Sequence, residues 1–250
     1  IYARSDRSQQ DLAGQSTMVR EAVSIARALQ DPLAEYCALC PGGDPTELLC
    51  LDMHPSQSFV IKMRGKERFA EILQRKFIDA VNAVGVDINR AAKYKNTAAQ
   101  LQFVSGLGPR KAIALLDWIF SQGGIVSSRE QLTSTTREQV KGILDPVVAR
   151  NCLAFIRIRE KYLAGMSITS EIDILDDTRV HPEHYRFARK IALDAYADSV
   201  SEREKKERKY DENNSNAVRD FMAKGREHLS RVISQIIDVE EFARKLEEQG

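Results

Sequence analysis

The sequence has little cysteine, no long apolar run and no excess of one charge. Four cysteines among 250 residues are too few for the disulfide framework of a small secreted domain, so a reducing compartment is expected. No stretch approaches the roughly 18 apolar residues of a membrane-spanning helix, which predicts no membrane association. The 37 Lys and Arg residues balance 36 Asp and Glu residues. Any binding to nucleic acid must therefore come from a local patch.

Recognisable catalytic motifs are also missing. The sequence contains no phosphate-binding Walker loop, no H-E-x-x-H pair, no G-x-S-x-G elbow and no Rossmann glycine triplet. Asp173, Asp176 and Asp177 cluster on a segment that resembles a linker, and we interpret them as a solvated acidic loop. The sequence therefore predicts a protein that is not an enzyme and carries no cofactor.

The two ends of the chain indicate a longer parent. The N-terminus has neither a Met nor an apolar signal core, and the C-terminus stops at Glu-Glu-Gln-Gly. We expect a fragment, whose 250 residues suffice for one large domain or two to three small ones.

Apolar residues recur at helical spacing along most of the chain. Ser16 or Thr17 can cap a helix with Val19, Ala22, Val23, Ala26 and Leu29 on its inner stripe, and Gly85 suits the end of a helix that starts near Lys66. The charged run 202–209 suits a solvated helix or link, and further helices are expected around 182–196, 218–221 and 229–246. The predicted fold is all-α, with little or no sheet.

The most informative segment is a tight Gly-x-Gly turn between two amphipathic helices, Leu101 to Ile119. Gly106 and Gly108 flank Leu107, and both glycines can adopt left-handed backbone angles. Pro109 suits the first position of the next helix, whose free N–H groups point toward the turn. This is the helix-hairpin-helix pattern, which grips a nucleic-acid phosphate without reading sequence.

The charge near this turn agrees with a phosphate site. Over residues 90–120, the only acidic residue is Asp117, and it is opposed by Arg90, Lys93, Lys95, Arg110 and Lys111. We therefore expect Gly106, Leu107, Gly108, Arg110 and Lys111 to contact nucleic acid. The alternative is that the hairpin only holds helices together.

Such hairpins usually occur in pairs, and a second copy fits residues 143–156. Asp145 and Pro146 stand where a glycine would open the turn. Asp145 can cap the following helix, but its carboxylate would repel a phosphate. We interpret this copy as structural.

Two groups of residues resemble metal sites. Cys37, Cys40, Cys50 and His54 have zinc-like spacing, but the cysteines lie on apolar stretches, so we interpret them as core residues. His181 and His184 are three residues apart, and His181 before Pro182 suits a helix cap. We predict no metal site, although a metal-dependent nuclease or repair module is a third hypothesis that bound zinc would support.

Several segments resemble the central core of the Spt-six (suppressor of Ty, six) family of transcription elongation factors and histone chaperones, to which bacterial Tex proteins are similar. The similarity is carried by residues 26–36, 81–91, 101–112, 179–195 and 240–250. The resemblance implies three parts: a helical segment after a YqgF domain (1–65), a tandem helix-hairpin-helix domain (66–164) and a death-like helical domain (165–250), which would start around His181-Pro182-Glu183.

The same resemblance implies a nuclear, non-catalytic scaffold. Its expected partners are the RNA polymerase II elongation complex, histones or the nucleosome and, weakly, the DNA or RNA backbone. The alternative is a pure protein-interaction scaffold with no nucleic-acid contact.

Overall fold

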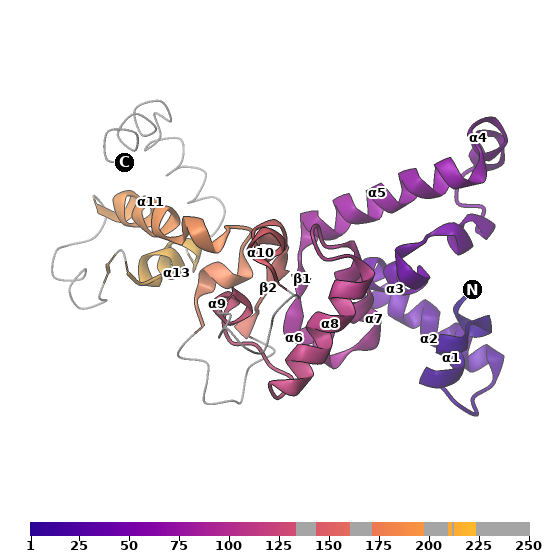
Figure 1. Ribbon diagram of the computed structural model, residues 1–250, viewed down its shortest axis with the longest axis horizontal. Coiled ribbons are helices and arrows are strands. Elements are labelled where there is room, and N and C mark those ends of the chain that lie inside the picture. The colour runs from indigo at the N-terminus through magenta and orange to yellow at the C-terminus, as the bar shows by residue number, and fades with distance from the viewer. Residues whose placement is uncertain (134–143, 161–171, 198–209, 212, 224–250) are drawn as a thin grey trace. The chain divides into compact units, whose positions relative to one another are not determined.

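The computed structural model describes residues 1–133, 144–160, 172–197, 210–211 and 213–223 (Figure 1). The chain divides into two compact units, Ile1–Ile172 and Asp173–Gly250. Helices dominate the described part, where the one sheet pairs β1 (Val86–Asp87) with β2 (Ile156–Arg157) in parallel. The all-α prediction is confirmed. The expected helix over 229–246, the charged run 202–209 and the motif at 240–250 lie outside the described residues.

Unit 1 is a series of mostly short helices. Its first part contains η1 (Tyr2–Arg4), α1 (Asp6–Asp11), α2 (Thr17–Gln30), α3 (Pro32–Ala38), η2 (Pro41–Gly43), η3 (Thr46–Cys50), α4 (Gln57–Arg64) and α5 (Lys66–Val84). After β1 come α6 (Ile88–Lys93), α7 (Lys95–Ala98), η4 (Ala99–Phe103), α8 (Gly108–Ser121), α9 (Arg129–Thr133), α10 (Pro146–Cys152) and η5 (Leu153–Phe155).

Local capping sets several of these boundaries. The Ser16 hydroxyl accepts a hydrogen bond from the Val19 N–H at 3.4 Å, and the Asp31 carboxylate accepts one from Ala34 at 3.0 Å. Gly85 ends α5 with a φ of 76°. The caps at Ser16 and Gly85 confirm two boundaries that the sequence predicts.

The inner face of α2 differs from the prediction. Leu29 is 83% exposed, Val19, Ala22 and Ala26 are also exposed, and α2 has no buried residue. Two side-chain hydrogen bonds link α2 to η1 and α3: Arg27 donates to the Tyr2 hydroxyl at 3.0 Å, and Ser24 donates to Glu35 at 2.7 Å. Most of the predicted apolar stripe therefore lies at the surface of α2, and Val23 is half-buried.

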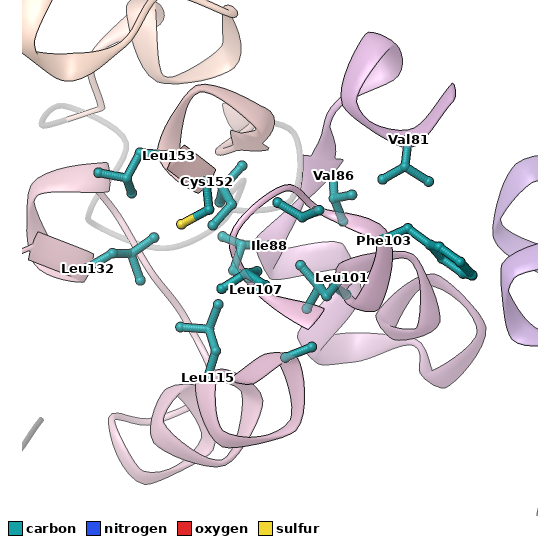
Figure 2. Packing of buried hydrophobic residues seen from close by; sticks show 14 of the residues in the cluster. Val81, Val86, Ile88, Leu101, Phe103, Leu107, Leu115, Leu132, Cys152 and Leu153 are labelled. Carbon is teal, nitrogen blue, oxygen red and sulfur yellow. The ribbon is translucent and has the colours of Figure 1, made fainter. Parts of the chain in front are cut away.

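The hydrophobic core of unit 1 is built around the predicted hairpin. Leu101 and Phe103 from η4, Leu107 from the turn and Leu115 from α8 are buried together. Figure 2 shows them beside Val81, Val86, Ile88, Leu132, Cys152 and Leu153, which come from elements on both sides of the hairpin in sequence. The hairpin therefore holds much of unit 1 together.

The four cysteines divide into three buried side chains and one exposed one. Cys37, Cys40 and Cys152 are buried, and burial raises the pKa of Cys40 and Cys152 to about 12 and that of Cys37 still further. Cys50 is exposed, so its assignment to the core was wrong. The segment forms the 3-10 helix η3, in which Leu48 and Leu49 are buried and Cys50 faces solvent. Within the described ranges, no His, Cys, Asp and Glu side chains form a group able to hold a metal ion.

Unit 2 contains η8 (Ile174–Asp177), η9 (Pro182–His184), α11 (Tyr185–Ala197) and α13 (Asn216–Ala223) among its described residues. Leu175, Tyr185, Ala192, Ala217 and Val218 form its core. His181 caps η9 by accepting from the Glu183 N–H at 3.2 Å, as predicted. None of the helices described in either unit is long and apolar enough to cross a membrane.

The interpretation of Asp173, Asp176 and Asp177 as a solvated acidic loop was wrong. Asp176 is only 1% exposed and accepts a hydrogen bond from the Tyr185 hydroxyl at 2.5 Å. Asp173 pairs with Arg189 at 2.5 Å and caps η8. The Tyr185 hydroxyl and the Arg189 guanidinium on α11 thus bind the carboxylates of Asp176 and Asp173 within unit 2.

Leu101 tests how far stability depends on the hairpin core. Its side chain is fully buried, so Leu101→Ala should lower the free energy of unfolding by about 2–5 kcal/mol. Ile113→Ala on the exposed face of α8 is the control and should cost well under half as much. Urea denaturation of both variants measures the difference, and equal losses would contradict this description of the core.

Cys50 should be the reactive thiol of this protein. Because only the thiolate attacks, the buried thiols with raised pKa should react slowly at pH 8. Titration of the native protein with Ellman's reagent should show one fast equivalent, and Cys50→Ser should remove it. A fast phase that survives in Cys50→Ser would mean that another cysteine is accessible.

Candidate nucleic-acid interface

The predicted turn joins η4 to α8, and both of its glycines adopt left-handed backbone angles. The φ angle is 86° at Gly106 and 68° at Gly108, a region that favours residues without a Cβ atom. Between them, Leu107 is only 4% exposed and anchors the turn in the core. Gly106 itself is exposed. The turn is therefore fixed from below by an apolar side chain and has backbone at the surface.

The backbone N–H groups of this turn are only partly used inside the protein. Leu107 donates its N–H to the Val104 carbonyl at 3.1 Å, and Ser105 donates to the Asn82 side chain at 3.1 Å. No acceptor among the described residues takes the N–H of Gly106, Gly108 or Arg110. Unpaired amides at the start of a 14-residue helix such as α8 form a site for a small anion, since the helix dipole adds partial positive charge there.

Asn82 on α5 holds the turn in place, and sequence reasoning did not single it out. Its side-chain oxygen accepts from the Ser105 N–H, and its amide nitrogen donates to the Ser105 hydroxyl at 3.0 Å and to the Ile78 carbonyl at 2.7 Å. Asn82 is 8% exposed. The sequence signal that could have identified Asn82 is a polar residue on the apolar face of an amphipathic helix.

Arg110 and Lys111 supply cations at the first turn of α8. Arg110 is exposed, and Lys111 is half-buried. The Lys111 Nζ donates to the Gly106 carbonyl at 3.3 Å, which brings its positive charge over the turn. An ammonium group has three N–H donors, so this bond leaves others for a phosphate oxygen.

The second predicted hairpin copy packs against the first. A Cβ atom at Gly106 would lie 2.9 Å from the Asn151 Cβ and 3.4 Å from the Val148 carbonyl oxygen, both on α10. Asp145 precedes α10 in the N-cap position, but its side chain is exposed and makes no capping hydrogen bond, contrary to the expected cap. The contact with Gly106 gives α10 a packing role.

The two compact units match two different family models. Residues 46–159 match a family model described as a helix-hairpin-helix motif, and residues 173–237 match one described as an HHH domain. Transcription elongation factor SPT6 of Drosophila melanogaster is 35% identical over 252 aligned residues, covering 100% of this chain. The chain belongs to the SPT6 (Spt-six) family.

Other SPT6 relatives show similar identity. Transcription elongation factor spt-6 of Neurospora crassa is 35% identical over 100% of this chain, and an Arabidopsis thaliana protein named transcription elongation factor SPT6-like is 39% identical over 79% of it. The chain spans 12%, 16% and 14% of the fly, Neurospora and Arabidopsis proteins, respectively. In the second unit the matching family model is described as an HHH domain, and the death-like assignment is not confirmed.

Gly106 and Gly108 should respond differently to a methyl group. Gly108→Ala introduces only backbone strain, of about 1–2 kcal/mol, because its chain neighbours aside, no described residue has an atom within 4 Å of the added Cβ. Gly106→Ala adds overlap with Asn151 and should lose about 1–3 kcal/mol more. Chemical denaturation of the two variants gives the comparison, and a smaller loss for Gly106→Ala would contradict the close approach of α10.

Proposed function

We propose that this chain is a non-catalytic scaffold of an SPT6-family transcription elongation factor, and that it makes a weak, sequence-independent contact with nucleic acid through Gly106, Leu107, Gly108, Arg110 and Lys111. The unpaired amides at Gly106, Gly108 and Arg110 carry this proposal, because a phosphate is the anion that suits them. Two cations at the same helix end support it.

The wider setting is proposed from the relatives, whose names describe transcription elongation factors. The chain acts in the nucleus, with the RNA polymerase II elongation complex and with histones or the nucleosome. Its parts are a helical segment after a YqgF domain (1–65), a tandem helix-hairpin-helix domain (66–164) and a death-like domain (165–250). No metal or other cofactor is needed for this role.

The alternative is a protein-interaction scaffold whose hairpin serves only for packing. The approach of α10 to Gly106 favours that alternative, because it explains one glycine without any ligand. It does not explain Gly108, since nothing in the described chain lies near the Cβ position of that residue. The two functions therefore make different predictions for Arg110 and Lys111. Only the nucleic-acid contact requires the positive charge of these two side chains.

Charge reversal at the hairpin tests the nucleic-acid contact. Arg110→Glu combined with Lys111→Glu should weaken duplex binding about ten-fold or more at 50 mM salt, since each phosphate contact also releases counterions. The slope of log affinity against log salt should fall by about 2, at roughly 0.9 per contact. Fluorescence anisotropy at several salt concentrations measures both quantities for duplex and single-stranded probes.

The matched control is Lys62→Glu combined with Arg64→Glu on α4. These two side chains are exposed, and the variant has the same net charge as the hairpin variant. It should keep most of the duplex affinity and the salt slope. If the two variants behave alike, or if the hairpin variant binds like the unmodified protein, the contact is not made at the hairpin.

A further inference from the structure

A second cationic site lies in unit 1, and none of its lining residues belongs to the hairpin turn. A cavity of about 730 Å³ is bounded by α1, α2, α6 and α7. Four cationic side chains line it, Arg27, Arg90, Lys93 and Lys95, together with a single carboxylate, Asp11. Its volume is in the range of small-ligand sites in proteins, roughly 300–1,000 Å³.

The carboxylates around this cavity do not neutralise its cations. Asp11 is shared by two of them and by Arg7, which does not line the cavity: its carboxylate oxygens lie 3.7 Å from Arg27 Nη1, 3.5 Å from Lys95 Nζ and 3.6 Å from Arg7 Nε. Its side chain is only 8% exposed, so Asp11 presents little negative surface. Arg90 pairs with Asp31 at 2.7 Å.

Lys93 has no carboxylate partner within the described part of the chain. Positive charge therefore remains at the cavity, and a bound anion would neutralise it.

An aromatic ring and an unsatisfied hydroxyl accompany these cations. Tyr94 is 46% exposed, and the Lys93 ammonium lies 5.5 Å from the centre of its ring. Thr97 lines the same cavity, and no described residue hydrogen-bonds its buried Oγ1 atom. A buried polar atom without a partner indicates a missing water or ligand.

We propose that this cavity binds a nucleotide unit, with the phosphate between Lys93, Lys95 and Arg27 and the base against the ring of Tyr94. Cations that follow a phosphate, combined with an aromatic surface, are the features by which proteins hold unpaired nucleotides regardless of sequence. A duplex cannot present a base face to Tyr94, so the ligand is a single strand or a free nucleotide. This site uses none of the hairpin residues, and it does not rest on the function proposed for them.

The test uses three probes on the intact protein: a ten-residue oligothymidylate, thymidine monophosphate and inorganic phosphate. Lys93→Gln combined with Lys95→Gln should weaken oligothymidylate binding about ten-fold and lower its salt slope by about 1.4, at roughly 0.7 per contact on single strands. Tyr94→Leu should weaken it about ten-fold with an unchanged slope, whereas Tyr94→Phe should retain binding because it keeps the ring. Lys62→Gln combined with Arg64→Gln on α4 is the control.

The three probes separate the possible sources of the nucleotide. Binding of thymidine monophosphate that depends on Tyr94 identifies a free nucleotide, and binding of the oligomer alone identifies a strand. The Arg110→Glu/Lys111→Glu variant should leave Tyr94-dependent binding in place, which separates this site from the hairpin. Unchanged affinity for both nucleotide probes in the Lys93→Gln/Lys95→Gln variant would overturn the proposal, as would binding of inorganic phosphate alone.

A measurement on the unmodified protein guards against variants that fail to fold. Ultraviolet cross-linking to an oligomer containing 4-thiothymidine should attach the base to the peptide that includes Tyr94. Mass spectrometry locates the cross-link. Cross-links found only in other peptides would reject the site even if the substituted proteins prove unstable.

Discussion

The hydrogen bonds of Asn82 fix the hairpin turn, and most features of the candidate interface depend on them. Asn82 extends from α5 and holds Ser105 through both its backbone N–H and its hydroxyl. With Ser105 held, Leu107 enters the core, and Gly106 is left at the surface. A buried amide that satisfies two groups of the turn thus determines which backbone atoms remain for a ligand.

Two other amide side chains in the described part of unit 1 bridge elements in a similar way. Asn89 exchanges two hydrogen bonds with the backbone of Val126, at 2.9 and 2.8 Å. Gln102 donates to the carbonyls of Cys37 and Cys40 at 3.0 and 3.1 Å. These side chains satisfy backbone groups that short helices leave unpaired. A protein made of short helices and tight connections needs such amides, because each break exposes polar backbone to an apolar core.

The sequence predicted the positions of the helices better than the tertiary contacts that their residues make. The helix boundaries at Ser16 and Gly85 follow from local capping, and the hairpin follows from two glycines between apolar runs. The face of α2 that packs against the rest of the protein could not be predicted. An apolar stripe shows which face of a helix is hydrophobic, but it does not show which face contacts other elements. The predictions that Cys50 is buried and that Asp176 is exposed were wrong for a related reason. The burial of Asp176 depends on Tyr185, nine residues away, and Asn82 contacts Ser105 across 23 residues.

Both glycines of the turn have left-handed backbone angles, but only Gly106 is also approached closely by another helix. Gly106 lacks a side chain because α10 approaches it closely, a reason internal to the fold. Among the described residues, none crowds the Cβ position of Gly108, so its left-handed backbone angle is the feature that favours glycine there. Arg110 and Lys111 follow in the first turn of α8, and Lys111 donates to the Gly106 carbonyl. The turn therefore packs against α10 at Gly106, and among the described residues the amides of both glycines and of Arg110 remain without an acceptor.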